Sequence, residues 1–200
     1  MTAPPSSAGH YESHAADYVR ALLEHDDGDN VDAFLDALGG TGPHDILDLG
    51  CGPGRTLKAL ADRGHRPVGL EAAPTLAAHA RAHSGCPVIE GDLLAHGFDR
   101  EICDGVYANA VLFNIPTPAL PGLLARLHAA LRPGGVLFAC DPTGDDSEGW
   151  IDGRHLAFRR PRSFDRMARA AGFGLLGQYR RPPGVPRRAQ DWRATLWRRA

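Results

Sequence analysis

The sequence predicts an α/β fold with a doubly wound, mostly parallel sheet of seven strands, one of them antiparallel near the C-terminus. From residue 45 onward, short apolar runs alternate with stretches of helical periodicity, which is typical of βαβ units with right-handed crossovers. Beyond residue 161 this alternation stops. Two strand-like runs then flank a segment rich in Pro and Arg, which predicts a closing hairpin with one antiparallel strand.

The first five strands are predicted from short apolar runs, as expected for parallel strands covered on both faces. These runs are DILDL (45–49), PVGLE (67–71), PVIEG (87–91), DGVYANA (104–110) and GVLFAC (135–140). Leucine stripes between them predict helices, one through Leu57 and Leu60 and another from Leu120 to Leu131. GLLGQYR (174–180) and RATLWRR (193–199) are the two closing strands.

We expect residues 1–9 to be a disordered tail, residues 10–40 a helical lid, and residues 41–200 the main domain. The apolar residues from Tyr11 to Leu22 fall at helical spacing, and a second short helix follows that Asn30 would cap and Gly39 would end. Further along the chain, Ser163 is expected to cap a helix that stops at Gly172.

The composition, 43% hydrophobic and 23% charged, is that of an ordinary soluble globular protein. The first residues have no basic flank and no apolar run, so we expect no signal peptide. The longest uncharged stretch, 105–125, is broken by prolines and asparagines and is a poor membrane span. No CxxC pair occurs, so we expect a reducing cytoplasm, no disulfide framework and no metal site. The cysteines are Cys51, Cys86, Cys103 and Cys140.

The net charge of −2 hides an asymmetry between the two parts of the chain. Residues 1–153 hold 22 acids and 9 bases, a net of −13, whereas residues 154–200 hold 2 acids and 13 arginines, a net of +11. Either the arginines neutralise the acidic body, or some of them line a pocket or patch for an anion. The sequence leaves both readings open.

The segment DLGCGPG (48–54) is the strongest functional motif, because it lies between a buried strand and a helix. Glycine permits positive φ and has no Cβ, so the backbone can approach a ligand closely. The helix that follows offers unpaired N–H groups. A nucleoside-bearing ligand fits at such a switch point.

Two acidic residues at later strand ends strengthen this reading. Glu71 closes the second strand about 20 residues on, where an acid is expected to bind ribose hydroxyls. Asp92 follows the third strand and reaches the same rim of the sheet. A glycine loop alone would be weak evidence for a nucleoside-binding site, but the loop together with both acids is specific evidence for one.

The pattern Asp48-x-Gly50-x-Gly52-x-Gly54 resembles the first motif of class I S-adenosylmethionine-dependent methyltransferases, in particular small bacterial proteins of the tellurite-resistance-like and ubiquinone-biosynthesis-like type. The resemblance implies a Rossmann-like methyltransferase fold and S-adenosylmethionine as cofactor. It implies that Asp48 and the glycines hold the methionine part, Arg55 its carboxylate and Glu71 the ribose. The full set of implied cofactor residues is Asp48, Gly50, Cys51, Gly52, Gly54, Arg55, Glu71, Ala72, Asp92, Leu93 and Asn109.

Within this resemblance Asp92 and the backbone of Leu93 would meet adenine, and Asn109 would face the methyl group. Many relatives have His where this chain has Asn114, so an obvious candidate base is missing. The catalytic residues therefore stay unassigned. A dedicated base is not required, because alignment of the acceptor with the S–methyl bond supplies most of the effect.

The candidate substrate-binding residues are Tyr11, Tyr18, Phe113, Arg154 and His155. The tyrosines either belong to a lid over the cofactor or form a core stripe. His155, like His10 and His14, is either a general base or a surface histidine. Arg154 either binds an anion or belongs to a solvated face, as do four later arginines. These are Arg180, Arg181, Arg187 and Arg188.

We expect methyl transfer to a small molecule, with an anionic one favoured by the charge split, and no nucleic-acid or membrane partner. Nucleic-acid amino-methyltransferases usually carry an Asn/Asp-Pro-Pro-aromatic motif, whereas this chain has Asn109-Ala110-Val111-Leu112. Asn109, Asp141 and residues 153–158 should converge above the sheet, where an acceptor would approach. The alternatives are a non-catalytic module that binds S-adenosylmethionine and a nicotinamide-dependent oxidoreductase. Monomer and homodimer both remain open.

Overall fold

The computed structural model describes residues 6–23, 28–180 and 191–200. Its main sheet has seven strands in the order β3-β2-β1-β4-β5-β9-β8, with a separate two-stranded β6-β7 hairpin. The strands are β1 (Asp45–Leu49), β2 (Arg66–Glu71), β3 (Val88–Glu90), β4 (Cys103–Asn109), β5 (Leu131–Pro142), β6 (Ser147–Ile151), β7 (Arg154–Phe158), β8 (Phe173–Arg180) and β9 (Trp192–Arg199).

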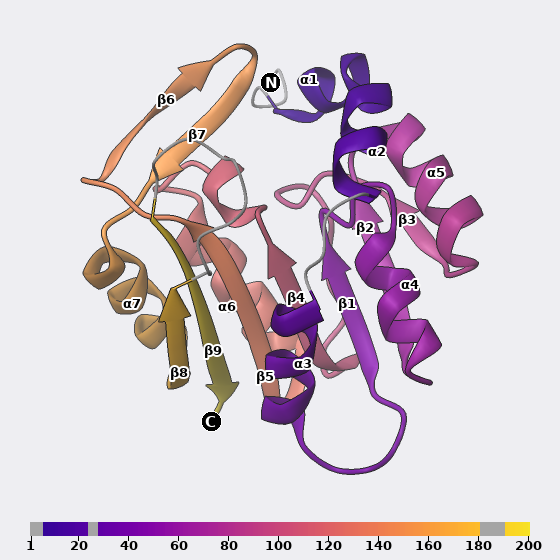
Figure 1. Ribbon diagram of the computed structural model, residues 1–200. Coiled ribbons are helices and arrows are strands. Elements are labelled where there is room, and N and C mark those ends of the chain that lie inside the picture. Colours follow the sequence, from indigo (N-terminus) through magenta and orange to yellow (C-terminus); the bar gives the residue numbers. More distant parts are fainter. Residues whose placement is uncertain (1–5, 24–27, 181–190) are drawn as a thin grey trace.

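The first five strands pair in parallel, and β9 pairs antiparallel with both β5 and β8. This topology confirms the predicted doubly wound sheet with one antiparallel strand near the C-terminus. The strand order reverses between β1 and β4, so a switch point lies at the carboxyl ends of these two strands. Figure 1 shows these ends directed toward the top of the molecule.

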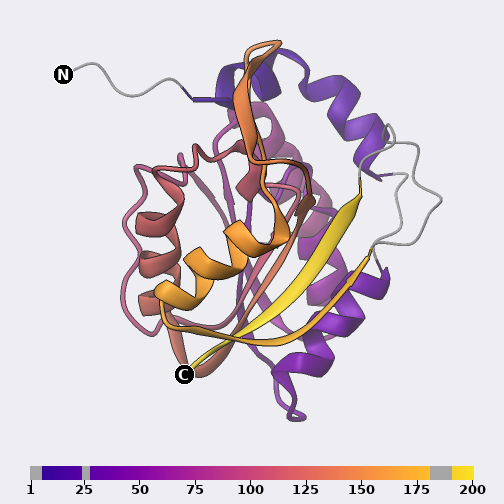
Figure 2. The ribbon, with the colours of Figure 1, turned by 90° about the vertical axis from the view of Figure 1, so that its left-hand side faces the viewer.

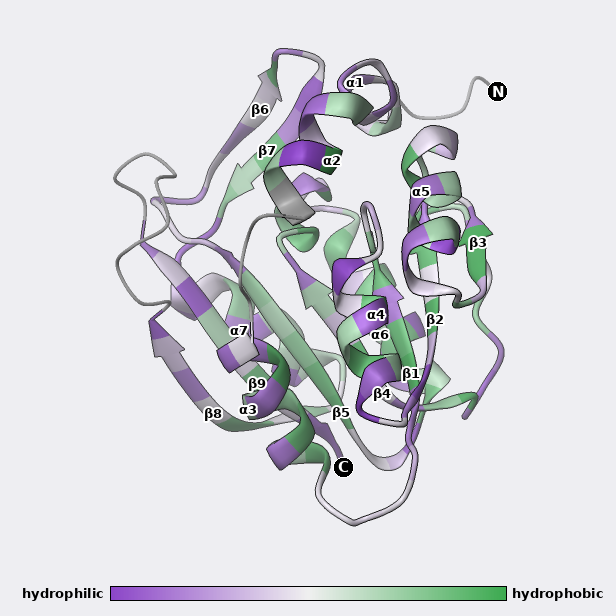
Figure 3. Ribbon diagram, turned by 45° about the vertical axis from the view of Figure 1, so that its right-hand side comes forward, coloured by the Kyte–Doolittle hydropathy of each residue, from purple (hydrophilic) through white to green (hydrophobic). Residues whose placement is uncertain are grey.

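Helices cover both faces of the sheet (Figure 2). They are α1 (Ala8–Ser13), α2 (Ala15–Leu23), α3 (Gly28–Leu38), α4 (Arg55–Asp62), α5 (Pro74–Ser84), α6 (Leu120–Ala130) and α7 (Pro161–Ala170). Phe34 of α3 packs with Ile46 and Phe138 in one core, and the leucines of α6 pack with Leu47 and Leu137 in the other. Apolar strands lie between the two layers (Figure 3), which explains why the predicted strands lack alternation.

Several predicted helix boundaries are wrong. Ser163 lies inside α7, whose N-cap is Arg160, and the Ser163 hydroxyl instead donates to Asp146 Oδ2 at 3.0 Å. Asn30 lies inside α3, where its Oδ1 accepts a hydrogen bond from the Tyr179 hydroxyl at 2.8 Å. In both cases the side chain that local propensity predicts as a helix cap instead forms a hydrogen bond to a residue distant in the sequence.

The N-terminal segment differs from the expected single helix. Helix α1 begins at Ala8, within the stretch expected to be a tail, and a break at His14 separates it from α2. Both helices contact α5. Figure 1 places them above the carboxyl edge of the sheet, beside the β6-β7 hairpin.

The β6-β7 hairpin was not predicted. Its turn is formed by Asp152 and Gly153, which have φ values of 49° and 74°. Positive φ at both central positions is what a type I′ turn requires, and Asp-Gly is a preferred pair for it. The hairpin brings Trp150, Arg154 and His155 to the rim above β4 and β5.

No helix among the described residues is long and apolar enough to cross a membrane.

Candidate cofactor and substrate site

A pocket of about 1180 Å³ is lined by residues at the carboxyl edge of the sheet, by residues of α1 and by residues of the β6-β7 hairpin. Pockets for one small ligand typically occupy about 300–1,000 Å³. The volume therefore suits a nucleoside-sized ligand together with a second small molecule.

The pocket brings together residues from four strand ends and from the N-terminal segment. Of the candidate cofactor residues, Asp48, Gly50, Cys51, Gly52, Arg55, Glu71, Ala72, Asp92, Leu93 and Asn109 line it. All five candidate substrate residues line it too: Tyr11, Tyr18, Phe113, Arg154 and His155. Gly54 is not among the lining residues. The structure thus assembles almost the whole predicted set in one space.

The glycine loop follows β1 directly, and its glycines have different roles. Gly50 and Gly52 have φ values of 59° and 53° and line the pocket. Gly54 has φ +90° and caps α4, and a Cβ there would lie 2.6 Å from Ala80 Cα in α5. Gly54 therefore permits close contact between two helices, and its expected contact with the cofactor is not seen in the pocket lining.

Glu71 supports the glycine loop from the end of β2. Its Oε2 accepts the N–H of Gly52 and its Oε1 the N–H of Ala73, both at 2.9 Å. The side chain lines the pocket although the residue is only 8% exposed, and burial raises its pKa. Each carboxylate oxygen has a second lone pair, so both can still accept a ligand hydroxyl.

Asp48, at the end of β1, is a buried acid with an unused acceptor. Its Oδ2 makes no hydrogen bond to any described residue. Burial, and then the neighbouring charge of Glu71, raise the pKa of Asp48 well above its usual value. A buried polar atom without a partner is costly. The position therefore fits a ligand that brings a donor or a positive charge.

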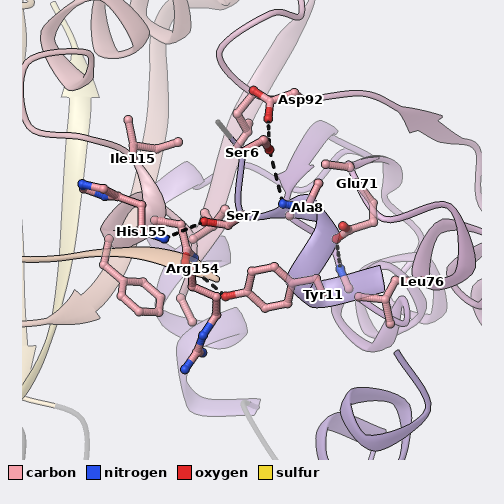
Figure 4. Close-up of a pocket in the computed structure, with 18 of the residues that line it drawn as sticks. Ser6, Ser7, Ala8, Tyr11, Glu71, Leu76, Asp92, Ile115, Arg154 and His155 are labelled. Atoms are coloured by element: carbon pink, nitrogen blue, oxygen red, sulfur yellow. Dashed lines mark hydrogen bonds between the residues drawn. The ribbon is translucent and has the colours of Figure 1, made fainter. Parts of the chain in front are cut away.

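The segment before α1 spans the pocket from β3 to the hairpin. The Ser6 hydroxyl donates to Asp92 Oδ2 at 2.6 Å, and Ser7 Oγ accepts the N–H of His155 at 3.0 Å. Figure 4 shows both serines between Asp92 and His155. The other oxygen of Asp92 accepts the N–H of Leu94 at 2.8 Å. Ser6 and Ser7 thus connect the end of the pocket beside β3 to the end formed by the hairpin.

Tyr11 and Tyr18 fit both interpretations of the N-terminal segment, a lid over the pocket and an apolar core stripe. They pack against Ala15 and Leu76 in a small core, yet they also line the pocket. The Tyr11 hydroxyl donates to Asn114 Oδ1 at 3.2 Å, and Arg154 Nη1 donates to the Tyr18 hydroxyl at the same distance. Burial and then Tyr18 raise the pKa of Tyr11, so it remains a neutral donor.

The loop after β4 is held by Asp141 and by the buried guanidinium of Arg159. Asp141 Oδ1 accepts the N–H of Phe113 at 3.2 Å, and Arg159 donates to the carbonyls of Leu112 and Ile115. Asp141 lines a separate cavity of about 30 Å³, so its expected convergence on the main pocket is wrong. Asp141 does not line the main pocket, but its hydrogen bond holds the backbone of Phe113, which does.

Stability should depend on pH through Asp141. Burial raises the pKa of this carboxyl from 3.8 to about 7. The folded chain then binds a proton that the unfolded chain has lost, so the free energy of unfolding should fall as pH rises from 4 to 7. Each unit between the two pKa values corresponds to about 1.4 kcal/mol. Urea unfolding of the wild type and of Asp141→Asn across this range measures the effect, and parallel curves would contradict it.

Sequence reasoning missed several pocket residues. The lining also includes Ser6, Ser7, Trp150, Ile151 and Trp192. For the hairpin residues a signal was present, since Asp-Gly between two strand-like runs predicts a hairpin. Nothing local in the serines or in Trp192 points to a ligand. Their place depends on long-range packing.

A known family profile covers the part of the chain that holds the glycine loop, Glu71 and Asp92. Residues 46–135 match the family profile described as "Methyltransferase domain". The sheet order, the glycine loop after β1 and the acidic residue ending β2 agree with it. Residues 46–135 are thus similar to a methyltransferase domain, and the sheet and the glycine loop agree with the fold expected of class I S-adenosylmethionine-dependent methyltransferases.

Relatives support this placement. The chain is 30% identical over 136 residues to a carboxy-S-adenosyl-L-methionine synthase of Chromohalobacter salexigens, covering 61% of this chain and 50% of that protein. It is 34% identical over 122 residues to a trans-aconitate 2-methyltransferase of Rhodopseudomonas palustris, covering 60% and 46%. A TehB-like S-adenosylmethionine-dependent methyltransferase of Corynebacterium glutamicum superposes with a TM-score of 0.73 at 22% identity, covering 94% and 99%. The chain spans about half the length of these curated relatives.

Proposed function

We propose that this chain transfers the methyl group of S-adenosylmethionine to a small-molecule acceptor. One observation carries the proposal: a single pocket joins the glycine loop, Glu71 and Asp92 to a second compartment under α1 and the hairpin. The cofactor supplies an electrophilic methyl carbon. A lone pair of the acceptor forms the new bond to that carbon, the electrons of the carbon–sulfur bond stay on sulfur, and the acceptor's proton passes to solvent.

The residues around the glycine loop would bind the cofactor in three parts. Glu71 would accept the ribose hydroxyls with the lone pairs that its amide contacts leave free. Asp92 and Leu93 would border the adenine, which requires Ser6 to share Asp92 or to move away from it. Asp48, with its unpartnered Oδ2, would face the methionine ammonium, and Arg55 the carboxylate.

The chain's own residues would then align the acceptor and exclude water. Asn109 and Phe113 line the pocket beside the glycine loop, where the methyl group would lie. Tyr11 and the serines before α1 would cover the reacting atoms. Arg154 supports an anionic acceptor, because its Nε is buried without a partner among the described residues. We propose a cytoplasmic location, where buried thiols such as those of Cys51 and Cys103 stay reduced.

Calorimetry and turnover together test the proposed function. S-adenosylmethionine and S-adenosylhomocysteine should bind, and NAD should not. Transfer of labelled methyl to a panel of small metabolites then separates an enzyme from a non-catalytic binding module. Binding of NAD without either sulfur nucleoside would reject the proposal in favour of an oxidoreductase.

Binding of the cofactor should release protons over the pH range in which the Asp48 carboxyl of the free protein titrates. Asp48 has a strongly raised pKa in the free protein, and a nearby ammonium would favour its ionised form. The heat of S-adenosylhomocysteine binding should therefore vary with the ionisation enthalpy of the buffer. In Asp48→Asn this variation should shrink. Equal proton release in both proteins would remove Asp48 from the ammonium site.

A further inference from the structure

Aromatic rings from four separate segments line the compartment beyond the glycine loop. They are Tyr11, Tyr18, Phe113, Trp150, Phe158 and Trp192. The rings of Tyr11 and Tyr18 are 5.0 Å apart, and those of Phe113 and Trp192 are 6.0 Å apart and nearly perpendicular. Such walls suit the face and edge of another flat ring.

The mouth of this compartment is apolar as well. Trp150 and Ile151 line it from the hairpin, although they are 46% and 47% exposed. Large exposed apolar side chains beside a pocket usually mark a surface that becomes covered when a ligand binds. A hydrophobic acceptor would cover them, whereas a fully hydrated one would leave them in water.

Positive charge in this compartment is scarce. Among the described residues that line it, Arg154 is the one permanent cation, and Arg55 lies on the cofactor side at the start of α4. Burial lowers the pKa of His155, so its imidazole is neutral at pH 7. Arg154 Nε has no partner among the described residues, and its Nη1 donates to the Tyr18 hydroxyl.

We propose that the acceptor is a planar aromatic compound that carries a single acidic group, with its ring between the aromatic walls and its acid on Arg154. This inference rests on the proposed function and names the substrate class of the same site. One guanidinium can pair one carboxylate through two parallel hydrogen bonds. An aliphatic tricarboxylate such as trans-aconitate would bring three negative charges to one arginine and no ring to the aromatic walls.

The test measures binding to protein saturated with S-adenosylhomocysteine, so that only the second compartment is probed. The probes are naphthalene-2-carboxylate, its uncharged carboxamide and trans-aconitate, each titrated by calorimetry. We expect the naphthalene carboxylate to bind at least about tenfold more tightly than the carboxamide, which corresponds to one charge-assisted pair. trans-Aconitate should bind more weakly than the naphthalene carboxylate.

Two variants assign the effect to the pocket. Arg154→Gln should abolish the preference for carboxylate over carboxamide, and Trp150→Ala should weaken both naphthalene probes to a similar degree. Arg162→Gln is the matched control, because Arg162 is an exposed arginine of α7 outside the pocket lining. It should change neither affinity.

The outcomes separate this inference from the function on which it rests. Failure of S-adenosylhomocysteine to bind would overturn the proposed function. If S-adenosylhomocysteine binds but the two naphthalene probes bind equally, the proposal that the acceptor carries an acidic group is wrong. If neither naphthalene probe binds, or trans-aconitate binds more tightly, the aromatic acceptor is wrong while the methyltransferase remains.

Discussion

Replacing Glu71 with Ala is expected to weaken the binding of S-adenosylhomocysteine by about a hundredfold or more. Two charge-assisted hydrogen bonds to the ribose, each worth about 1.5–3 kcal/mol, would be lost. The structure adds a second effect. The N–H groups of Gly52 and Ala73 would lose their acceptor, so the loop that cradles the cofactor would lose its support as well.

The same contacts predict that Glu71→Ala also lowers stability, by about 1–3 kcal/mol for each buried amide left without a partner. Glu71→Gln keeps one oxygen acceptor and should recover part of the stability but little of the affinity. Glu90→Ala, an exposed acid at the end of β3, is the control. Calorimetry and urea unfolding measure the two quantities. Unchanged affinity in a folded Glu71→Ala would remove this residue from the cofactor site.

Replacing Gly54 with Ala is expected to destabilise the fold by several kcal/mol. The φ of +90° is strained for any residue with a Cβ, at about 1–2 kcal/mol. The new Cβ would also lie 2.6 Å from Ala80 Cα and 2.8 Å from its carbonyl oxygen. Because these are backbone atoms, α4 and α5 must move apart. Overpacking of this kind typically costs about 1–3 kcal/mol.

Gly64→Ala is the matched control for this prediction. Gly64 has φ +83°, and no atom lies within 4 Å of the place where its Cβ would be. It should show the backbone strain without the clash, so the difference between the two variants isolates helix packing. Equal loss of stability in urea unfolding would show that α4 and α5 adapt freely. If Gly54→Ala were fully stable but lost cofactor binding, Gly54 would contact the cofactor directly instead of serving helix packing.

The amino-acid sequence alone predicts the succession of strands and helices from residue 45 onward and the location of the glycine loop. Each buried strand is a local run of apolar residues, and the turn after β1 needs glycine wherever φ is positive. Glu71 and Asp92 could be placed at the rim for the same reason, because parallel strands end at one edge. The resemblance to class I methyltransferases follows from these local features.

The tertiary structure decided what each side chain contacts. Only packing shows that Glu71 holds loop amides, that Gly54 lets α4 and α5 pack closely, and that Asp141 and Arg159 hold the loop after β4. It also brought Tyr11 and Arg154, far apart in the chain, into one pocket. Strand and turn propensities act over a few residues, whereas these contacts join segments separated by many residues and depend on how the finished layers pack against each other.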